Sequence, residues 1–246
     1  MNKIVLVVSV FMMVAISGHS QIFKNLLNRD STGINKVLKS VKGGKLSTTD
    51  IGAGLKEALS VGVQKGTSQL SSMNGFFGDA AVKILMPPEA VKAEKTLRNM
   101  GLGKQVDEAI LSMNRAAEDA AKSAAPIFVK AIKQMSIQDA VGILKGGDSA
   151  ATKYLRGKTT VSLTAAFSPV VQQSLGKVDA TKYWNTVFSA YNSVPFVKKV
   201  NTDLNAYVTD RALAGIFYQV ALEEGKIRTN PMAQTTDLLK KVFGGK

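Results

Sequence analysis

The sequence contains no cysteine, and its one histidine is His19. Without cysteine the chain can form neither disulfides nor thiolate metal sites, so a folded domain has to be stabilised by its hydrophobic core. His19 lies in the segment that we expect to be removed from the mature protein. The mature chain then has neither residue type, which excludes Ser-His-Asp and Cys-His catalysis and zinc sites built on imidazole. Carboxylate chemistry, a Ser-Lys pair and a metal site of oxygen ligands stay open.

Complete nucleotide-binding motifs are also missing. Residues 157–159 (Gly-Lys-Thr) resemble the end of a phosphate-binding loop, but the glycine required earlier in that motif is replaced by Thr152. Residues 101–103 (Gly-Leu-Gly) begin a dinucleotide fingerprint whose third glycine is replaced by Val106. The aspartate-rich loop typical of calcium sites is absent as well. We therefore expect no cofactor and no bound metal.

The N-terminal segment has the pattern of a secretory signal peptide. Lys3 supplies a positive charge, and an apolar run follows over residues 4–16. This run is too short to cross a bilayer, which takes roughly 20 residues. Gly18 and Ser20 place small residues just before a cleavage site. We predict that residues 1–20 are a signal peptide cleaved after Ser20, and that the protein is exported to the periplasm or secreted. An uncleaved anchor would need a longer apolar run.

Residues 21–45 form a basic leader with helical periodicity. An amphipathic helix of this kind can lie on an anionic membrane surface, although it can also pack against its own domain or remain a mobile leader. The formal net charge of +14 is typical of a protein with an anionic partner, or of a surface that is charged only for solubility. For an exported protein we expect a membrane surface, an anionic polymer or an acidic protein, and no nucleic acid. The residues that would contact the membrane are Ile34, Lys36, Val37, Leu38, Lys39, Val41 and Lys42.

Residues 46–246 are predicted to form a single, mainly α domain, a multi-helix bundle. Apolar residues recur there at helical spacing, with no fixed repeat or dividing linker. Turn-forming pairs within residues 74–79, followed by an apolar run and two prolines, favour a short β-hairpin or a pair of extended segments near residues 75–86. Pro169 is predicted to begin a new segment, and Gly225 to end the last long helix.

Capping signals mark one helix in the middle of the chain. Ser136 is a good N-cap residue, and Asp139 stands three residues later in the capping-box position. The two glycines at 146–147 should end this helix. Asp148 or Ser149 should then cap the helix that follows.

Polar side chains among small residues define a candidate site in the alanine-rich stretch of residues 113–154. The functional interpretation is a polar pocket in a helical groove. The structural interpretation is a hydrogen-bond network between closely packed helices, because buried polar groups are usually paired within the protein. A second cluster of the same kind lies on the last long helix. The candidate binding residues are Asn114, Arg115, Glu118, Asp139, Thr152 and Tyr154 in the first cluster, and Tyr207 and Arg211 in the second.

Two functional hypotheses follow from these observations. The first is a non-enzymatic envelope protein that binds a partner protein, a lipid or an anionic polymer. The second is a carboxylate-dependent hydrolase or lyase that uses Glu118 and Asp139. The lack of histidine and cysteine in the mature chain favours the first hypothesis, under which no residue is catalytic.

Several short stretches together resemble one known family. They are GLKEAL at 54–59, ILMP at 84–87, MNRAAE at 113–118, MSIQDA at 135–140, ILKG at 143–146, ATKY at 151–154, YVT at 207–209, ALAGIF at 212–217, EE at 223–224, IR at 227–228 and NP at 230–231. With them the chain resembles the bacterial exported family known as domain of unknown function 4197, over roughly residues 46–244. The resemblance implies an exported, mainly helical bacterial protein. It implies no particular activity and brings no catalytic residues, and the basic leader lies outside it.

Overall fold

The computed structural model describes residues 47–177 and 203–229, together with residues 184–185, 188–189, 192–193, 195–196 and 199 between them. The predicted signal peptide (residues 1–20) and basic leader (residues 21–45) lie outside the described residues.

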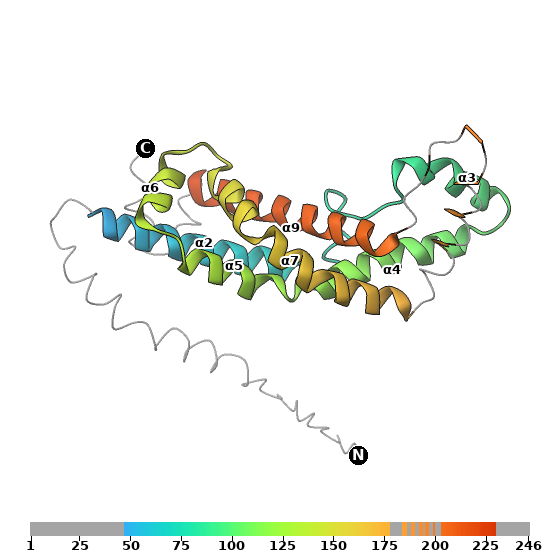
Figure 1. Cartoon of the computed structure of the whole chain (residues 1–246), viewed down its shortest axis with the longest axis horizontal. Coiled ribbons are helices and arrows are strands. Elements are labelled where there is room, and N and C mark those ends of the chain that lie inside the picture. Colours follow the sequence, from blue (N-terminus) through green and yellow to red (C-terminus); the bar gives the residue numbers. More distant parts are fainter. Residues whose placement is uncertain are drawn as a thin grey trace, which may run out of the picture. The chain divides into compact units, whose positions relative to one another are not determined.

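The described part of the chain is helical throughout (Figure 1), which confirms the predicted mainly α class. It contains no strand. The elements in chain order are α2 (Thr48–Ser71), the 3-10 helix η1 (Pro88–Ala90), α3 (Val91–Asn99), α4 (Gly103–Ala121), α5 (Ala124–Lys133), α6 (Ile137–Lys145), α7 (Ala150–Gly176) and α9 (Leu204–Thr229). Residues 72–87 connect α2 to η1 and are called the α2–η1 loop below.

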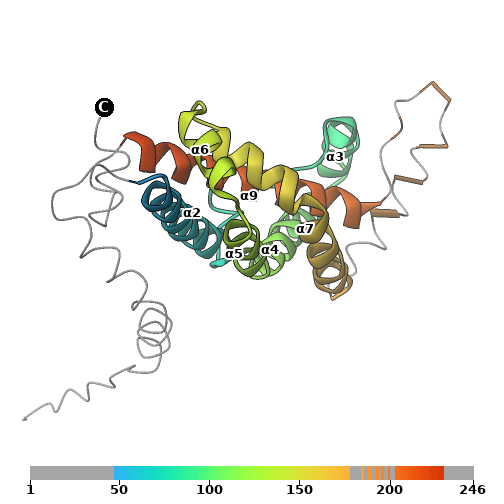
Figure 2. The same ribbon diagram turned by 60° about the vertical axis from the view of Figure 1, so that its left-hand side comes forward.

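Helix α9 holds the bundle together, because it packs against α2, α4 and α7 (Figures 1 and 2). Helices α5 and α6 each contact both α2 and α7, and α3 packs on α4. Large side chains fill the space between these helices. Phe128 of α5 meets Phe217 of α9 edge to face, with ring centroids 5.7 Å apart. One large buried core therefore extends from α2 to α9, and Ala58 and Ile227 form a small separate cluster.

Small residues on α2 allow α9 to approach closely. A Cβ atom added at Gly66 would lie 3.0 Å from Cγ of Gln219, and one added at Gly62 would lie 3.2 Å from Cδ1 of Ile227. Both distances are shorter than ordinary van der Waals contact, so a larger residue at either position would require its neighbour to shift by a few tenths of an ångström. The two glycines thus fix where the helices touch.

The predicted start and end of α6 are confirmed. The backbone amide of Asp139 donates to the hydroxyl of Ser136 at 3.0 Å, and the amide of Ser136 donates to the carboxylate of Asp139 at 2.9 Å. This is the reciprocal pattern of a capping box. The helix ends at residue 145, and Gly146 is its C-cap.

Two other predicted boundaries are wrong. Helix α7 continues through Pro169, because a buried apolar stripe with helical spacing runs past the proline on both sides. Helix α9 continues past Gly225 to residue 229. Its last turn is held by the buried side chain of Ile227 and by an ion pair between Glu224 and Arg228. Tertiary contacts override the local breaking signal in both helices.

The short β-hairpin expected near residues 75–86 is not formed. Residues 73–78 are turns, and residues 83–87 have no regular secondary structure. The turn signals themselves were meaningful, since Asn74 has a positive φ of 64°. Strands do not form because side chains of α4 take the backbone hydrogen bonds that a partner strand would have made, as described next.

Candidate functional site

Asn114 of α4 binds the α2–η1 loop through its side-chain amide. Its Oδ1 accepts a hydrogen bond from the amide of Ile84 at 2.8 Å. Its Nδ2 donates to the carbonyls of Ile84 at 2.8 Å and Ile110 at 2.7 Å. Asn114 is fully buried. One side chain therefore satisfies both backbone groups of Ile84, as a neighbouring strand would.

Glu118, one turn further along α4, holds the start of the same loop. Its Oε1 accepts hydrogen bonds from the amides of Phe76 at 3.1 Å and Phe77 at 3.2 Å, and its Oε2 accepts one from Arg115 at 2.5 Å. Arg115 also donates to Oδ1 of Asn74 at 2.8 Å. Glu118 is buried, and all of these partners belong to the chain itself. The three predicted residues on α4 thus all bind the same loop.

Thr152 belongs to a second network, centred on Glu224 of α9. Glu224 accepts hydrogen bonds from the amides of Ala151 at 3.0 Å and Thr152 at 2.9 Å, and from the hydroxyl of Thr152 at 2.7 Å. Arg228 donates to the same carboxylate at 2.9 Å and to the carbonyl of Ile143 at 3.0 Å. Glu224 therefore caps α7, whereas Ser149 at the N-cap position makes no side-chain capping bond.

Asp139 and Tyr154 lie at the start of α6 and α7. The Tyr154 hydroxyl is 3.4 Å from Oδ2 of Asp139. The backbone hydrogen bond from Ser136 lowers the pKa of Asp139, and that from the Ser136 hydroxyl adds to it. Burial raises the pKa of Tyr154, and the negative charge of Asp139 raises it further. The Asp139 carboxylate is used for capping, and the residue is half-buried.

Tyr207 and Arg211 of α9 form hydrogen bonds with different partners. The Tyr207 hydroxyl donates to the carbonyl of Leu85 at 2.8 Å, and its ring stacks on Trp184 with centroids 6.2 Å apart. Burial raises the pKa of Tyr207. Arg211 is exposed and binds the adjacent Asp210 at 2.6 Å. The structure therefore distributes the predicted residues over separate networks and does not gather them into one groove. Glu118 and Asp139, in particular, share no partner.

A pocket lies beside these networks, between α3 and α4. Its volume is about 680 Å³, which is within the range of small-molecule sites. The wall is mainly apolar, although six of the sixteen lining residues are polar or charged. The lining residues are Met86, Glu94, Leu97, Leu102, Gln105, Val106, Glu108, Ala109, Leu111, Ser112, Met113, Arg115, Ser174, Trp184, Phe188 and Leu204.

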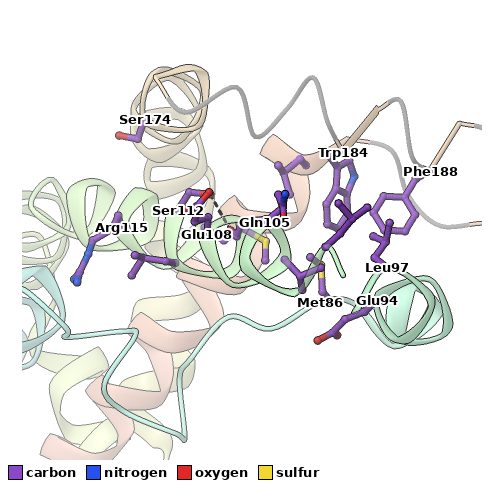
Figure 3. Close-up of a pocket in the computed structure, with 16 residues that line it drawn as sticks. Met86, Glu94, Leu97, Gln105, Glu108, Ser112, Arg115, Ser174, Trp184 and Phe188 are labelled. Carbon is purple, nitrogen blue, oxygen red and sulfur yellow. Dashed lines mark hydrogen bonds between the residues drawn. The ribbon is translucent and has the colours of Figure 1, made fainter. Parts of the chain in front are cut away.

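The pocket exists because one side of α4 carries small residues. Ala109 and Ser112 lie on that side, and they leave space that larger side chains would fill. Trp184 and Phe188 close one end of the pocket together with Leu97 of α3 (Figure 3). The two aromatic rings contact each other, with centroids 4.4 Å apart. Arg115 lies at the opposite end of the pocket, beyond Ser112 (Figure 3).

Sequence reasoning missed this pocket, and it also missed Glu224 and Arg228. The pocket is assembled from four helices and three segments between helices, so no short motif describes it. One signal was available, because Ala109 and Ser112 interrupt the larger side chains of α4 at helical spacing. The second network had a weaker signal, the pairing of Glu224 with Arg228 four residues later, which is a common helix-surface pattern.

A metal-binding cluster and a membrane-spanning helix are both absent from the part of the chain that the structure describes. It contains no cluster of three or more acidic, histidine or cysteine side chains that could hold a metal ion. It also contains no helix that is both long and apolar enough to cross a membrane.

The family model described as "Protein of unknown function (DUF4197)" matches residues 45–244. The chain belongs to this family. The match covers every helix described above, both buried glutamate networks and the pocket. No curated protein and no solved structure matches the chain. Membership of this family assigns no activity to the chain.

Proposed function

We propose that this protein is an exported, non-enzymatic binding protein, and that its ligand is a small molecule with a hydrocarbon part that occupies the pocket between α3 and α4. The observation that carries the proposal is the pocket itself, with a mainly apolar wall and a volume of about 680 Å³. Buried apolar surface supplies most of the affinity in such sites, and a few polar groups fix the orientation.

The hydrogen bonds of the polar lining residues support an apolar ligand. The Ser112 hydroxyl donates to the carbonyl of Ala109 at 2.8 Å, and the Ser174 hydroxyl donates to Asp119 at 3.1 Å. Glu94 is paired with Arg98 at 3.0 Å. Most polar groups around the pocket are therefore already engaged, so a ligand gains chiefly from contact with the apolar wall. A hydrocarbon chain fits this wall better than a sugar or a nucleotide would.

The carboxylate-dependent hydrolase or lyase is the weaker alternative. General acid–base catalysis needs a carboxyl group that can reach the substrate. Glu118 is buried and already accepts three hydrogen bonds from the protein, and Asp139 caps α6. Neither residue lines the pocket. No second function is proposed from them.

Trp184 allows a direct test, because it is the only tryptophan in the chain and lines the pocket. Titration of the purified protein with dodecanol, below the concentration at which it separates from water, should change the fluorescence of Trp184 with saturation. The variant Ala109→Phe fills the pocket and should abolish the change. Ala165→Phe, at an exposed position of α7 away from the pocket, is the matched control and should bind as the parent does. A fluorescence signal that Ala109→Phe leaves unaltered would refute the proposal.

Export is a separate part of the proposal and rests on the sequence of residues 1–20. Secretion of the full chain in a bacterial host should yield a mature protein whose first residue is Gln21. N-terminal sequencing of the periplasmic or secreted protein checks this. A protein that stays in the cytoplasm and still begins with Met1 would contradict the prediction of export.

The basic leader supplies a further proposed contact, with an anionic membrane surface. Its alternating basic and apolar residues, from Ile34 to Lys42, would lie along the membrane surface. Deletion of residues 21–45 should reduce sedimentation of the mature protein with anionic vesicles but leave dodecanol binding unchanged. Equal sedimentation of the two proteins would rule out this role.

A further inference from the structure

We infer that the ligand of the pocket carries an anionic group, and that Arg115 is the residue that selects it. This inference rests on the proposed function, because it assigns the class of ligand for the same pocket. It adds that the ligand is an amphiphile whose hydrocarbon part contacts Trp184 and whose carboxylate or phosphate group binds Arg115.

The position of Arg115 is the first reason. It is the only cation among the described residues that line the pocket. It lies at the end opposite Trp184 and Phe188, so the pocket is aromatic at one end and positively charged at the other (Figure 3). The lining residues of α4 run from Gln105 to Arg115, roughly 15 Å at about 1.5 Å per residue. The distance between the two ends suits a hydrocarbon chain of medium length.

Arg115 also keeps hydrogen-bonding capacity. A guanidinium group has five N–H donors in a fixed planar arrangement. One nitrogen, Nη1, donates to Glu118, and the other, Nη2, donates to Asn74. The side chain is 37 % exposed, so the remaining donors can reach a ligand. The two bonds hold the guanidinium in place before a ligand arrives, which lowers the entropy lost on binding.

The charges around Arg115 favour an anion as well. Glu118 neutralises one positive charge, but Lys83 adds another. The ammonium group of Lys83 lies 3.9 Å from the ring centroid of Phe77, and the guanidinium of Arg115 lies 6.0 Å from the same centroid. Within the described residues, Lys83 has no carboxylate partner. Near Arg115, two cations therefore stand against the single buried carboxylate of Glu118. The two other carboxylates that line the pocket, Glu94 and Glu108, are each paired with a basic residue, Arg98 and Lys104.

The first experiment compares head groups on the unmodified protein. Fluorescence of Trp184 is titrated at neutral pH with dodecanoate, dodecyl phosphate, dodecanol and dodecylammonium, all below their micelle concentrations. We expect one or both anions to bind about tenfold or more tightly than dodecanol, as charge-assisted hydrogen bonds to arginine require. Dodecylammonium should bind most weakly. Comparison of the affinities for the two anions shows whether the pocket prefers a carboxylate or a phosphate ester.

The second experiment separates recognition by Arg115 from its support of the loop. Arg115→Gln should lose the tenfold preference for the anion while its affinity for dodecanol stays within about twofold of the parent. If Arg115 only supported the fold, both affinities would fall together. Arg115→Lys should retain part of the preference. Lys95→Gln, which removes an exposed charge from α3 outside the pocket, is the control and should keep the full preference.

The outcomes distinguish this inference from the proposed function. If dodecanol binds but the anions bind no better, the pocket is a hydrocarbon site and the role of Arg115 is wrong. If none of the four compounds changes Trp184 fluorescence, the proposed function itself fails. If Arg115→Gln still prefers the anion, another cation binds the anionic group, and the inference is overturned.

Discussion

Glu224 accepts hydrogen bonds from both the backbone amide and the hydroxyl of Thr152, at 2.9 and 2.7 Å. The first amides of a helix have no partners within the helix, and a side chain near the start of the helix usually supplies them. In α7 the partner comes instead from α9, 72 residues further along the chain. The negative charge of Glu224 also faces the positive end of the α7 dipole.

Glu118 has the same kind of environment in the other network. Each of the two buried glutamates accepts hydrogen bonds from two consecutive backbone amides, and each is paired with an arginine of its own helix. Glu118 thereby fixes an irregular loop, and Glu224 fixes the start of a helix. Both carboxylates bind backbone amides that have no other hydrogen-bond partner among the described residues, so we expect both to matter for folding.

Replacement of Glu224 by alanine should strongly destabilise the protein. The change leaves Arg228 buried without its carboxylate and frees two amides at the start of α7. Breaking a buried ion pair costs roughly 3–5 kcal/mol. The free energy of unfolding, measured by urea denaturation, checks the loss. Asp210→Ala removes one partner of an exposed pair with Arg211 and should cost less than about 1 kcal/mol. Similar losses in the two variants would contradict the capping role of Glu224.

Asn114→Asp should loosen the α2–η1 loop. The substituted carboxylate can still accept from the amide of Ile84, but it cannot donate to the carbonyls of Ile84 and Ile110. Each unpaired buried group costs roughly 1–3 kcal/mol. We expect lower stability and faster tryptic cleavage after Lys83, which lies in the loop. Asn99→Asp, at the exposed end of α3, is the control. Unchanged cleavage after Lys83 would show that Asn114 does not hold the loop.

The comparison of α6 with α7 shows how much of the fold the sequence could predict. The capping box of Ser136 and Asp139 is complete within four residues, so local chemistry was enough to place the start of α6. The cap of α7 needs a residue from α9, and its position depends on tertiary packing. The same difference explains the α2–η1 loop, where the turn at Asn74 was predictable but the side chains that replace a partner strand were not.

The candidate site was predictable only in part, for a related reason. Asn114, Arg115 and Glu118 were identified as polar residues in a small-residue environment, and they do act together. Periodicity cannot tell which helices meet, so residues of three different networks were considered as one cluster. The pocket is harder still to predict, because its lining residues come from segments that lie far apart in the sequence. Ala109 and Ser112 indicate a cavity only when the positions of Trp184 and Leu97 are known.

Acidic pH should weaken the protein partly through Asp139. Its pKa in the folded protein lies below the ordinary value of 3.8, chiefly because of the backbone hydrogen bond from Ser136. A lowered pKa contributes stability that is complete above the ordinary value and is lost as the pH falls through the folded-state value. Asp139→Asn cannot titrate, so its stability should fall less steeply than that of the parent as the pH is lowered below about 4. Thermal melts over this range measure the difference.

Other carboxyl groups with shifted pKa values do not affect the difference between Asp139→Asn and the parent. The pKa of Asp119 is lowered by the hydrogen bond from Lys122, and the pKa of Glu57 is raised by burial. These two effects have opposite signs, and both are present in parent and variant, so they cancel in the difference. Parallel melting curves for Asp139→Asn and the parent would mean that the α6 cap does not depend on the charge of Asp139.

Two glycines of α9 allow a paired test of close packing. A Cβ atom at Gly215 would lie 2.5 Å from Cε1 of Phe76, which is fully buried and held by Glu118 through its amide. Phe76 cannot move away easily, so Gly215→Ala should destabilise the protein by roughly 1–3 kcal/mol. A Cβ atom at Gly225 meets nothing within 4 Å, so Gly225→Ala should stabilise the helix by roughly 0.5–1 kcal/mol. Urea denaturation of the two variants should give shifts of opposite sign. Stabilisation by both substitutions would show that Phe76 can yield, and that the loop is held less tightly than its hydrogen bonds indicate.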